Sequence, residues 1–562
     1  MRDKASAREP GGSFRTLTGP RALMQTRIAT PSAAPRTLTA DPAEWSPAAN
    51  PWMVAVSVML ATFMVVLDSS VANVALPHIA GNLSASTDES TWVLTSYLVS
   101  NAIMLPAAGW ITRRIGRKRL LTISILVFTG ASVLCGMSAN MPMLIVARVL
   151  QGIGGGGMQP LAQSILLESF PPHRHGTAMA VYGMGIVVAP VIGPTLGGWI
   201  TDSYSWRWIF YINLPVGVLA LLMTRTFIED PPYIKRSFRG AIDYLGFGLM
   251  AVWLGTLQLL LDKGQEADWF GSAWIVWITA ISAAAFAGFV RRELTDGEPI
   301  VQLRVLADRN FSVGTLITTL YGFVLYGTTA LLPLFLQTVM GYPALESGLA
   351  VSPRGFGSIA SMIVVGVLVN YVDGRVLLAC GFGILGYSVL LLSRVNLSMS
   401  MVSVIFPNVI NGFATGFIFV PLTTMTMGRL RKERIGNAAG IYNLMRNIGG
   451  SIGIAAVTTF LVRGSQIHQQ YLVGNVTAGS AATDRLVRGL ETTFGIHGAD
   501  PLTAHRRALG ALYGIVQQQA TLLAYVDNFR FLGYLALAMI PLAVLFHGVR
   551  RKRQGGGEVS VE

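Results

Sequence analysis

The chain has 562 residues, of which 52% are hydrophobic and 12% are charged, about half the charged fraction of a typical soluble domain. This composition excludes an ordinary soluble protein and indicates an integral membrane protein. The formal net charge of +14 is therefore attributed to basic loops that fix topology, and nucleic-acid binding is not expected. Both cysteines, Cys135 and Cys380, fall in apolar segments, which argues against a disulfide framework.

Residues 1–50 are polar and lack the apolar core of a signal peptide, so they are predicted to form a disordered cytoplasmic tail. A membrane-spanning helix needs ~20 apolar residues. Fourteen such segments follow in chain order: 52–77, 91–111, 119–139, 142–163, 176–200, 208–227, 244–262, 272–291, 311–336, 347–370, 375–395, 401–427, 435–462 and 527–548.

The loops after even-numbered helices are basic, and those after odd-numbered helices are poor in basic residues. The basic loops contain "TRRIGRKR", then Lys235, Arg236 and Arg239, then "GRLRKER" and "RRKRQ". Because basic loops stay on the cytoplasmic side, both termini are predicted to be cytoplasmic. The long polar loop 463–526 should then lie outside.

The segment 500–526 within this external loop has helical spacing of apolar residues. Its predicted apolar face comprises Leu502, Ala508, Leu512, Ile515 and Leu522. We interpret it as an amphipathic helix that lies on the membrane surface or against a partner.

The two halves of the chain resemble each other weakly. "ARVLQGIGGGGMQPL" in the fourth segment and "PNVINGFATGFIFVPL" in the twelfth have polar, glycine and proline residues at similar offsets. Internal repeats are typical of transporters. The predicted fold is therefore an all-α membrane protein with a six-helix bundle (51–228), an inserted pair (243–292), a second six-helix bundle (310–549) and a tail (550–562).

Asp68 places a carboxylate in the middle of the first apolar segment. A charge at a helix centre costs roughly 2.5–3.5 kcal/mol on insertion scales, so such residues tend to face protein or a cavity and to be functional. Its helix face carries Ala61, Ala72 and Ala75, which indicates close contact with another helix. Asp68 either titrates during transport or caps a neighbouring helix.

Arg148 in the fourth segment is the expected partner of Asp68. It begins a polar stripe that continues through Gln151, Gly155, Gln159 and Gln163 at steps of three and four residues. An arginine stays charged at working pH, whereas burial disfavours a charged carboxylate. The pair either switches its protonation during proton-coupled transport or is a static buried ion pair.

The fifth segment carries small residues at four-residue steps. Gly185, Ala189, Gly193 and Gly197 form a ridge for close helix packing, and two prolines interrupt its hydrogen bonds. The prolines are Pro190 and Pro194.

Several other motifs are excluded by their context. "GIGGGG" at 152–157 lies inside a membrane segment and not after a strand, so it does not indicate a dinucleotide site. The sequence contains no Gly-Lys pair and hence no Walker A motif, which favours an ion gradient as the energy source. His173 and His175 are interpreted as loop residues rather than metal ligands. No metal, cofactor or enzymatic activity is expected.

A second embedded cation, Arg446, lies on the thirteenth segment and shares its face with Tyr442 and Asn443. It either binds an anionic group of the substrate or pairs with a carboxylate. The residues predicted to line a substrate cavity are Trp92, Tyr97, Asn101, Gln159, Gln163, Gln258, Asn443 and Arg446.

Six motifs in order resemble the major facilitator superfamily, and in particular its fourteen-helix drug:proton antiporters of the EmrB/QacA type. They are "LDSSVANVALP", "TWVLTSYLV", "GWITRRIGRKR", "RVLQGIGGGG", "GPTLGGWI" and "WRWIFYINLPVG". The resemblance spans roughly 52–549 and is greatest to EmrB-type multidrug exporters. The stretches "LQLLLDKGQEADWF" and "PLTTMTM" also resemble sequences of that type.

The resemblance assigns roles to particular residues. Asp68 matches the embedded acid of the family, Arg148 matches the arginine linked to proton transfer, and the ridge from Gly185 to Gly197 with its two prolines matches the antiporter motif. The cytoplasmic gating loop corresponds to Gly109, Arg113, Gly116, Arg117 and Lys118. Arg113 replaces the usual Asp of that loop, and Asp373 could supply a carboxylate from the other half.

The resemblance implies a proton-driven exporter of hydrophobic or amphipathic compounds in the bacterial inner membrane. It also implies a periplasmic adaptor and an outer-membrane channel as partners, with 463–526 as the contact. A dedicated metabolite or lipid exporter on the same scaffold is an alternative. A non-transporting receptor is a weaker one, because a receptor has no use for a titrating pair at the membrane midplane.

Overall fold

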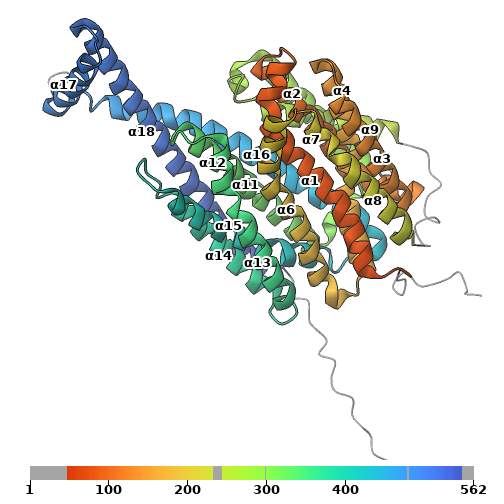
Figure 1. Cartoon of the computed structure of the whole chain (residues 1–562). Coiled ribbons are helices and arrows are strands. Elements are labelled where there is room, and N and C mark those ends of the chain that lie inside the picture. Colours follow the sequence, from red (N-terminus) through yellow and green to blue (C-terminus); the bar gives the residue numbers. More distant parts are fainter. Residues whose placement is uncertain (1–46, 232–242, 298, 478–479, 547–562) are drawn as a thin grey trace, which may run out of the picture. The chain divides into compact units, whose positions relative to one another are not determined.

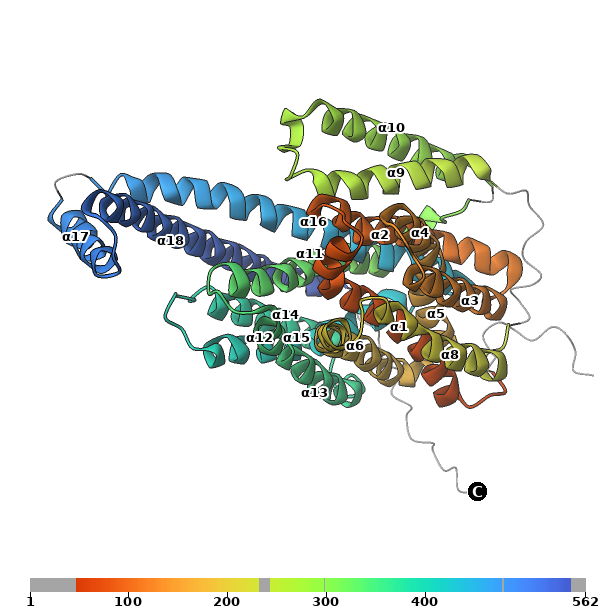
Figure 2. The ribbon, with the colours of Figure 1, turned by 45° about the horizontal axis from the view of Figure 1, so that its top comes forward.

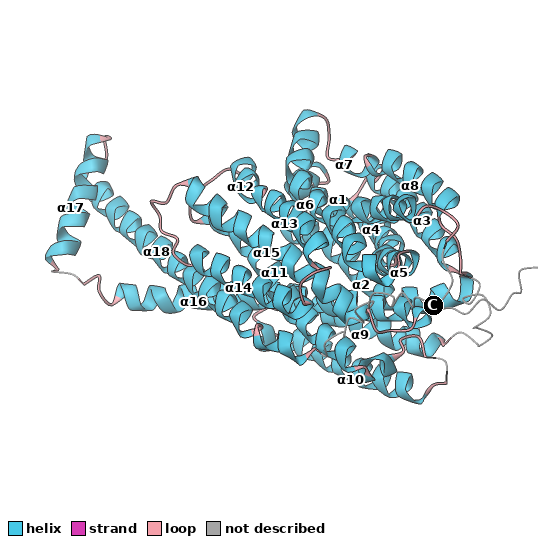
Figure 3. Cartoon of the chain, turned by 90° about the horizontal axis from the view of Figure 1, so that it is seen from below, coloured by secondary structure: helices cyan, strands magenta, loops and turns pink. Residues whose placement is uncertain are grey.

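The computed structural model describes residues 47–231, 243–297, 299–477 and 480–546. Every regular element in these ranges is a helix (Figure 3). They belong to one compact unit that begins at Trp45. The predicted tails at 1–50 and 550–562 lie outside the described residues except for 47–50, as do Lys235, Arg236 and Arg239.

The first predicted bundle begins with a helix capped by Asn50, whose side chain accepts a hydrogen bond from the backbone of Trp52. The second helix begins with a capping box between Ser86 and Glu89. The helices of this bundle are α1 (Pro51–Asn82), α2 (Thr87–Ile115), α3 (Arg117–Gly136), α4 (Met141–Gly156), α5 (Met158–Ser169), α6 (His175–Ser203), α7 (Trp208–Tyr211) and α8 (Asn213–Phe227), with the 3-10 turn η1 (Pro172–Arg174) before α6.

Thirteen helices in the described ranges are long and apolar enough to cross a membrane. The fourth predicted segment, 142–163, is absent from this count because Gly157 divides it into α4 and α5, of 16 and 12 residues. Gly157 keeps helical dihedrals (φ −77°, ψ −19°), so α5 continues the course of α4. With this interrupted helix included, each of the fourteen predicted segments has helical structure. The chain is a multi-pass membrane protein.

The predicted inserted pair forms an antiparallel hairpin of α9 (Tyr244–Lys263) and α10 (Ala273–Thr295), joined through η2 (Trp269–Gly271). It lies to one side of the other helices, with α9 nearer to them and α10 beyond it (Figure 2). Ser451 donates a hydrogen bond to Gln258 Oε1 at 3.0 Å, which ties α9 to the second bundle. Thr95 of α2 bonds to Asp262, which ties α9 to the first bundle. The inserted pair therefore contacts both bundles.

The second bundle follows the 3-10 turn η3 (Leu303–Ala307). Its tenth predicted span consists of two helices that meet at Ser352, where the backbone remains helical (φ −51°, ψ −36°). The helices of this bundle are α11 (Arg309–Thr338), α12 (Ala344–Val351), α13 (Pro353–Leu368), α14 (Gly374–Leu392), α15 (Met401–Met427), α16 (Lys432–Val473) and α18 (Pro501–Ala538), with η4 (Pro541–Leu545) at the end.

The predicted polar loop at 463–526 is largely helical, which corrects the predicted helix ends at 462 and 527. Helix α16 continues to Val473, α17 covers Ala481–Ile496, and α18 begins at Pro501. At 1.5 Å per residue, the 42 residues of α16 extend about 63 Å, whereas the hydrocarbon core is about 30 Å thick. Hydropathy therefore predicted only the most apolar part of α16 and of α18, which was about the length that a bilayer requires. We call residues 463–526 the helical extension (Figure 1).

The amphipathic helix predicted within this extension is present, but its apolar face is buried against other helices of the same protein. The buried stripe runs at four-residue steps through Ala504, Ala508, Leu512, Val516 and Ala520. Of the predicted face, Leu502 and Ile515 are instead exposed. The stripe is turned toward α16 and α17, because α18 packs against both of these helices.

Candidate functional site

The carboxylate of Asp68 lies in the interior of the first bundle and is only 2% exposed. It accepts hydrogen bonds from Arg148 Nη1 at 2.6 Å, from Gln151 Nε2 at 2.8 Å and from Asn213 Nδ2 at 2.7 Å. The pairing of Asp68 with Arg148 that the sequence suggested is therefore present. Three donors converge on the two oxygens of this side chain, so both are satisfied as acceptors.

Arg148 is fully buried and is held by further contacts. Its Nε donates to the carbonyl of Val93 at 2.9 Å, and Nη1 donates to Gln151 Oε1 at 2.6 Å. The guanidinium carbon lies 4.3 Å from the centroid of the Tyr97 ring, a cation–π contact. The positive charge is thus positioned by α1, α2 and α4 together.

Ser132 of α3 connects two of the donors to Asp68. Its hydroxyl accepts from Gln151 Nε2 at 2.6 Å and from Asn213 Nδ2 at 2.9 Å. The sequence reasoning did not select Ser132 or Asn213. The signal was present for Asn213, because it is an amide within the otherwise apolar segment 208–227. We call Asp68, Arg148, Gln151, Asn213 and Ser132 the buried acid network.

The small-residue ridge of α6 packs against α1, the helix that carries Asp68. A Cβ at Gly193 would lie 2.6 Å from Ser70 Cβ, and one at Gly197 would lie 2.9 Å from Val71 Cγ1. Real Cβ atoms do not approach so closely, so these positions require glycine for the observed helix separation. On the same ridge, Gly185 faces Met59, Ala189 is buried, Pro190 is exposed and Pro194 is partly buried.

Polar side chains join the two bundles where α5 meets α16. Asn443 Nδ2 donates to Gln163 Oε1 at 2.7 Å, and Arg446 Nη2 donates to Gln159 Oε1 at 2.9 Å. Four of the residues predicted to line a substrate cavity therefore contact one another in this conformation. We call these two pairs the inter-bundle junction.

The other four predicted cavity residues lie elsewhere. Tyr97 belongs to the surroundings of Arg148, and Gln258 accepts from Ser451. The Asn101 amide nitrogen is 3.3 Å from a Cβ built at Gly155, so it faces α4. Trp92 is 39% exposed. The structure does not bring these four residues together with the junction into one site.

The family follows from comparison with known sequences. Residues 58–454 match the family described as the Major Facilitator Superfamily. The chain belongs to this superfamily. A facilitator of this kind is a membrane transporter and not an enzyme.

Relatives of this facilitator include multidrug exporters. It is 40% identical to "Multidrug export protein EmrB" of Escherichia coli K12 over 424 residues, which cover 75% of this chain and 82% of the relative. It is 36% identical to "Fatty acid resistance protein FarB" of Neisseria gonorrhoeae over 499 residues, covering 89% and 96%.

Solved structures support the facilitator fold. The human organic anion transporter MFSD10 matches with a TM-score of 0.55 at 14% identity, over 86% of this chain and 99% of that one. The proton:xylose symporter XylE matches with a TM-score of 0.51 at 14% identity, over 88% and 99%. At this identity, the likeness establishes the fold alone.

Part of the facilitator's predicted gating loop is anchored within the first bundle. Arg117 forms a buried bidentate ion pair with Glu168 of α5, with Nη2 to Oε1 at 2.5 Å. Gly116 has a φ of +90°, which favours glycine, and Asp230 accepts from the Lys118 backbone at 2.9 Å. Glu168 had not been selected because it falls at a helix end.

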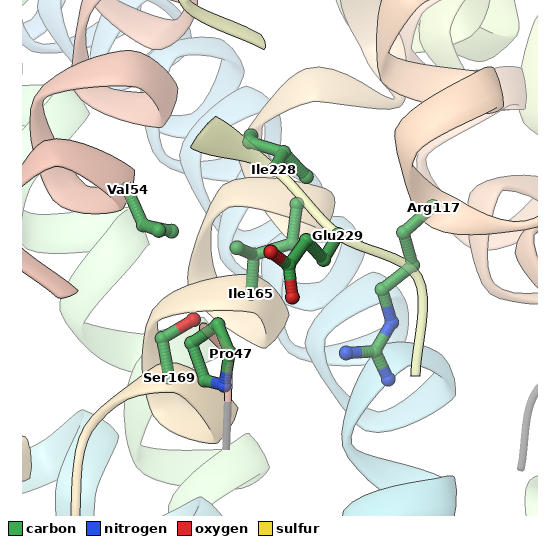
Figure 4. A pocket seen from close by; sticks show the side chains of 7 residues that line it. All are labelled: Pro47, Val54, Arg117, Ile165, Ser169, Ile228 and Glu229. Carbon is green, nitrogen blue, oxygen red and sulfur yellow. The ribbon is translucent and has the colours of Figure 1, made fainter. Parts of the chain in front are cut away.

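A small pocket of about 10 Å³ lies beside Arg117, space for one water at most (Figure 4). Ala48 donates its backbone N–H to Glu229 at 3.1 Å, which brings the start of the described chain to the end of α8. This end of the first bundle is thus closely packed. The residues that line the pocket are Pro47, Val54, Arg117, Ile165, Ser169, Ile228 and Glu229.

The remaining two gating-loop residues, Gly109 and Arg113, contact segments outside the first bundle. A Cβ at Gly109 would lie 2.8 Å from the Asn437 Cα of α16. Arg113, which replaces the usual Asp, donates to the carbonyl of Pro299 at 3.0 Å, in the connection from α10 to α11. The suggested partner Asp373 instead caps α14 by accepting from the backbone of Arg375 at 2.9 Å. The suggestion that Asp373 supplies a carboxylate from the other half stays a prediction.

Proposed function

We propose that this facilitator is a proton-coupled antiporter that exports hydrophobic or amphipathic compounds across the bacterial inner membrane. The observation that carries the proposal is the buried acid network around Asp68. The carboxylate accepts from three donors on two other helices of the bundle, so adding a proton, which turns an acceptor oxygen into a donor, would alter the contacts between these helices. The similarity to EmrB multidrug export proteins supports export of drug-like compounds.

In this mechanism, Asp68 takes up and releases the proton, and Arg148 stays charged throughout. Protonation of Asp68 removes the negative charge that holds Arg148, so the helices that meet at the network can change their arrangement. Substrate binds near the midplane between the bundles, and the inter-bundle junction opens and closes in alternation with the opposite side. The gating loop and the ridge of α6 belong to the same movement.

The proposed topology places both termini in the cytoplasm and the helical extension in the periplasm. The basic loops of the sequence support this orientation. Because α16 and α18 exceed the bilayer thickness, their surplus length must enter an aqueous compartment. The extension is then suited to contact a periplasmic adaptor, which would connect the exporter to an outer-membrane channel.

A dedicated exporter of lipid-like metabolites is the second candidate function. It is favoured by the similarity to the fatty acid resistance protein FarB, which extends over 96% of that relative's length. Both candidates share the coupling chemistry at Asp68 and differ in the substrate. A non-transporting receptor would leave the buried acid network without a role.

The test is Asp68→Asn in proteoliposomes, with Asp202→Asn as the matched control because Asp202 is a largely exposed acid at the end of α6. Asparagine retains shape and hydrogen bonding but cannot titrate. We expect Asp68→Asn to lose uphill export while keeping some substrate binding, and Asp68→Glu to keep partial function. Uphill pumping by Asp68→Asn, with affinity that still follows pH as in the wild type, would place the coupling acid elsewhere.

A further inference from the structure

A third arginine lies within the membrane part of the chain, in a position that the sequence reasoning passed over. Arg354 is the second residue of α13, in the apolar stretch "GLAVSPRGFGSIA". It comes ten residues after the start of α12, or roughly 15 Å along the span. Charged residues at such depth are costly and normally pair with an opposite charge.

The backbone at Arg354 is closely fixed between three helices. Ser358 donates its hydroxyl to the Arg354 carbonyl at 3.1 Å and to the Gly412 carbonyl of α15 at 3.0 Å. A Cβ at Gly412 would collide with the Arg354 carbonyl, and one at Gly355 would collide with Val191 in the ridge segment of α6. The position of Arg354 is therefore set by α6, α13 and α15 together, at the boundary between the bundles.

The side chain of Arg354 has little compensation for its charge. Nη1 donates to the hydroxyl of Thr329 in α11 at 2.7 Å, while Nη2 is buried and has no acceptor among the described residues. Arg446 is similar, since its Nη2 reaches the neutral amide of Gln159 and its Nε is buried without an acceptor in the described structure. Tyr321 is buried on α11, the helix that carries Thr329, and its hydroxyl has no partner among the described residues.

The two bundles differ in the counter-charge of their cations and not in unpartnered donors, since Arg148 Nη2 is also without an acceptor among the described residues. In the first bundle, the buried cations Arg148 and Arg117 each form an ion pair with a carboxylate. In the second bundle, no ion pair with a carboxylate is found for Arg354 or Arg446 within the described ranges.

The nearest acid along the chain, Glu346, is exposed in the first turn of α12 and forms no ion pair with Arg354 in the described structure. The next acids on either side are engaged at helix ends. Asp308 caps α11 by accepting from Phe311 at 2.9 Å, and Asp373 caps α14. Arg446 is buried and Arg354 is partly exposed within the membrane part of the chain. A charge in such surroundings is unfavourable without a counter-charge, so the second bundle lacks an anion that the first bundle supplies from its own residues.

We propose that Arg354, together with Arg446 and Tyr321, binds the carboxylate headgroup of an amphipathic anionic substrate. The inference rests on the proposed export function and adds the chemical class of the substrate and the residues that select it. The planar guanidinium presents parallel N–H groups that match the two oxygens of a carboxylate. Nη2 of Arg354 supplies the free donor, and the buried Tyr321 hydroxyl, which has no partner among the described residues, supplies a second polar group.

The experiment measures binding to the purified full-length protein in neutral-lipid nanodiscs, with decanoate and its neutral analogue decanamide as probes. A hydrogen-bonded charge pair is worth about 1.5–3 kcal/mol, so wild type should prefer decanoate by about tenfold or more. Arg354→Gln should abolish the preference, and Arg354→Lys should retain part of it. Arg394→Gln, which removes an exposed arginine after α14, should leave it unchanged.

An unchanged preference for decanoate in a folded Arg354→Gln variant would overturn the proposal. If Arg354→Gln does not fold, Arg354→Lys and Thr329→Val take its place. A preference for decanoate as large as that of the wild type in both variants would then overturn the proposal. Nanodiscs with phosphatidylglycerol test the other source of an anion. Loss of decanoate binding to wild type in these nanodiscs would identify a lipid phosphate as the occupant and overturn the substrate assignment.

These outcomes are separable from failure of the proposed function. Uphill export is measured in proteoliposomes with decanoate and, separately, with the permanent cation tetraphenylphosphonium, which has no carboxylate. Absence of uphill transport of both compounds would reject the antiporter, whatever the binding of decanoate. Absence of a preference for decanoate in the wild type, or an unchanged preference in Arg354→Gln, with intact export would reject the Arg354 site alone.

Discussion

Asn443 Nδ2 donates a hydrogen bond to Gln163 Oε1 at 2.7 Å, although 280 residues separate the two in sequence. Both side chains are fully buried, and they belong to different bundles. A second bond, from Arg446 to Gln159, lies beside the first on the same pair of helices. These contacts close the space between the bundles on the side where α5 ends and α16 begins, which is the cytoplasmic side in the proposed topology.

Asn443→Ala should weaken this closure. The change leaves Gln163 buried with an unpaired carbonyl oxygen, at a cost of about 1–3 kcal/mol to the closed state. Spin labels at Thr226→Cys and Arg431→Cys, both exposed on that side, should then report a longer distance between the bundles. Asn528→Ala is the control, since Asn528 is a buried amide that donates within its own helix, to Ala524. An unchanged distance distribution in Asn443→Ala would show that the junction does not hold the closed state.

Gly193→Leu should block export with little loss of expressed protein. The new side chain would meet Ser70 of α1 and separate two helices that must pack closely. Gly198→Leu on the same helix is the matched control, because a Cβ there has no neighbour within 4 Å. Export and expression are measured for both variants. Wild-type export by Gly193→Leu would contradict a packing role for the ridge during transport.

Glu168→Gln should destabilise the protein strongly. It leaves Arg117 buried beside a neutral amide, and breaking a buried pair in this way costs about 3–5 kcal/mol. Asp296→Asn provides the comparison, because Asp296 pairs with the partly exposed Arg292 and such pairs are worth about 0–1 kcal/mol. Thermal unfolding in detergent gives both values. Equal small shifts for the two variants would mean that the Arg117 pair is solvated.

The proposed topology predicts that the helical extension is reached from outside the cell. A single cysteine at the exposed position Ala482 of α17, in a Cys135→Ser and Cys380→Ser background, should react with an impermeant thiol reagent on intact cells. A cysteine at Thr226, at the exposed end of α8, should react only after permeabilisation. The reverse pattern would invert the assigned orientation of all fourteen segments.

The sequence alone determined the elements that depend on local chemistry. Apolar segments of bilayer length predicted every spanning helix, because the cost of exposing backbone polar groups to lipid makes a helix of that length obligatory. The four-residue glycine ridge predicted close packing, and two opposite charges in apolar surroundings predicted that Asp68 and Arg148 would meet. Each inference required only spacing along one helix and the cost of an unpaired charge.

The tertiary structure decided which distant polar groups share a site. Asn213 and Ser132 complete the surroundings of Asp68 from two other helices, and Gln163 meets Asn443 from the opposite bundle. Sequence spacing carries no information about such partners, because a polar side chain can be satisfied by any helix that packs beside it. Likewise, hydropathy began the last predicted helix at 527, whereas α18 begins at Pro501 and buries the stripe from Ala504 to Ala520 where it packs against other helices, among them α16 and α17. The uncompensated charge of Arg354 emerged for the same reason: only the packed helices show that no carboxylate among the described residues reaches it.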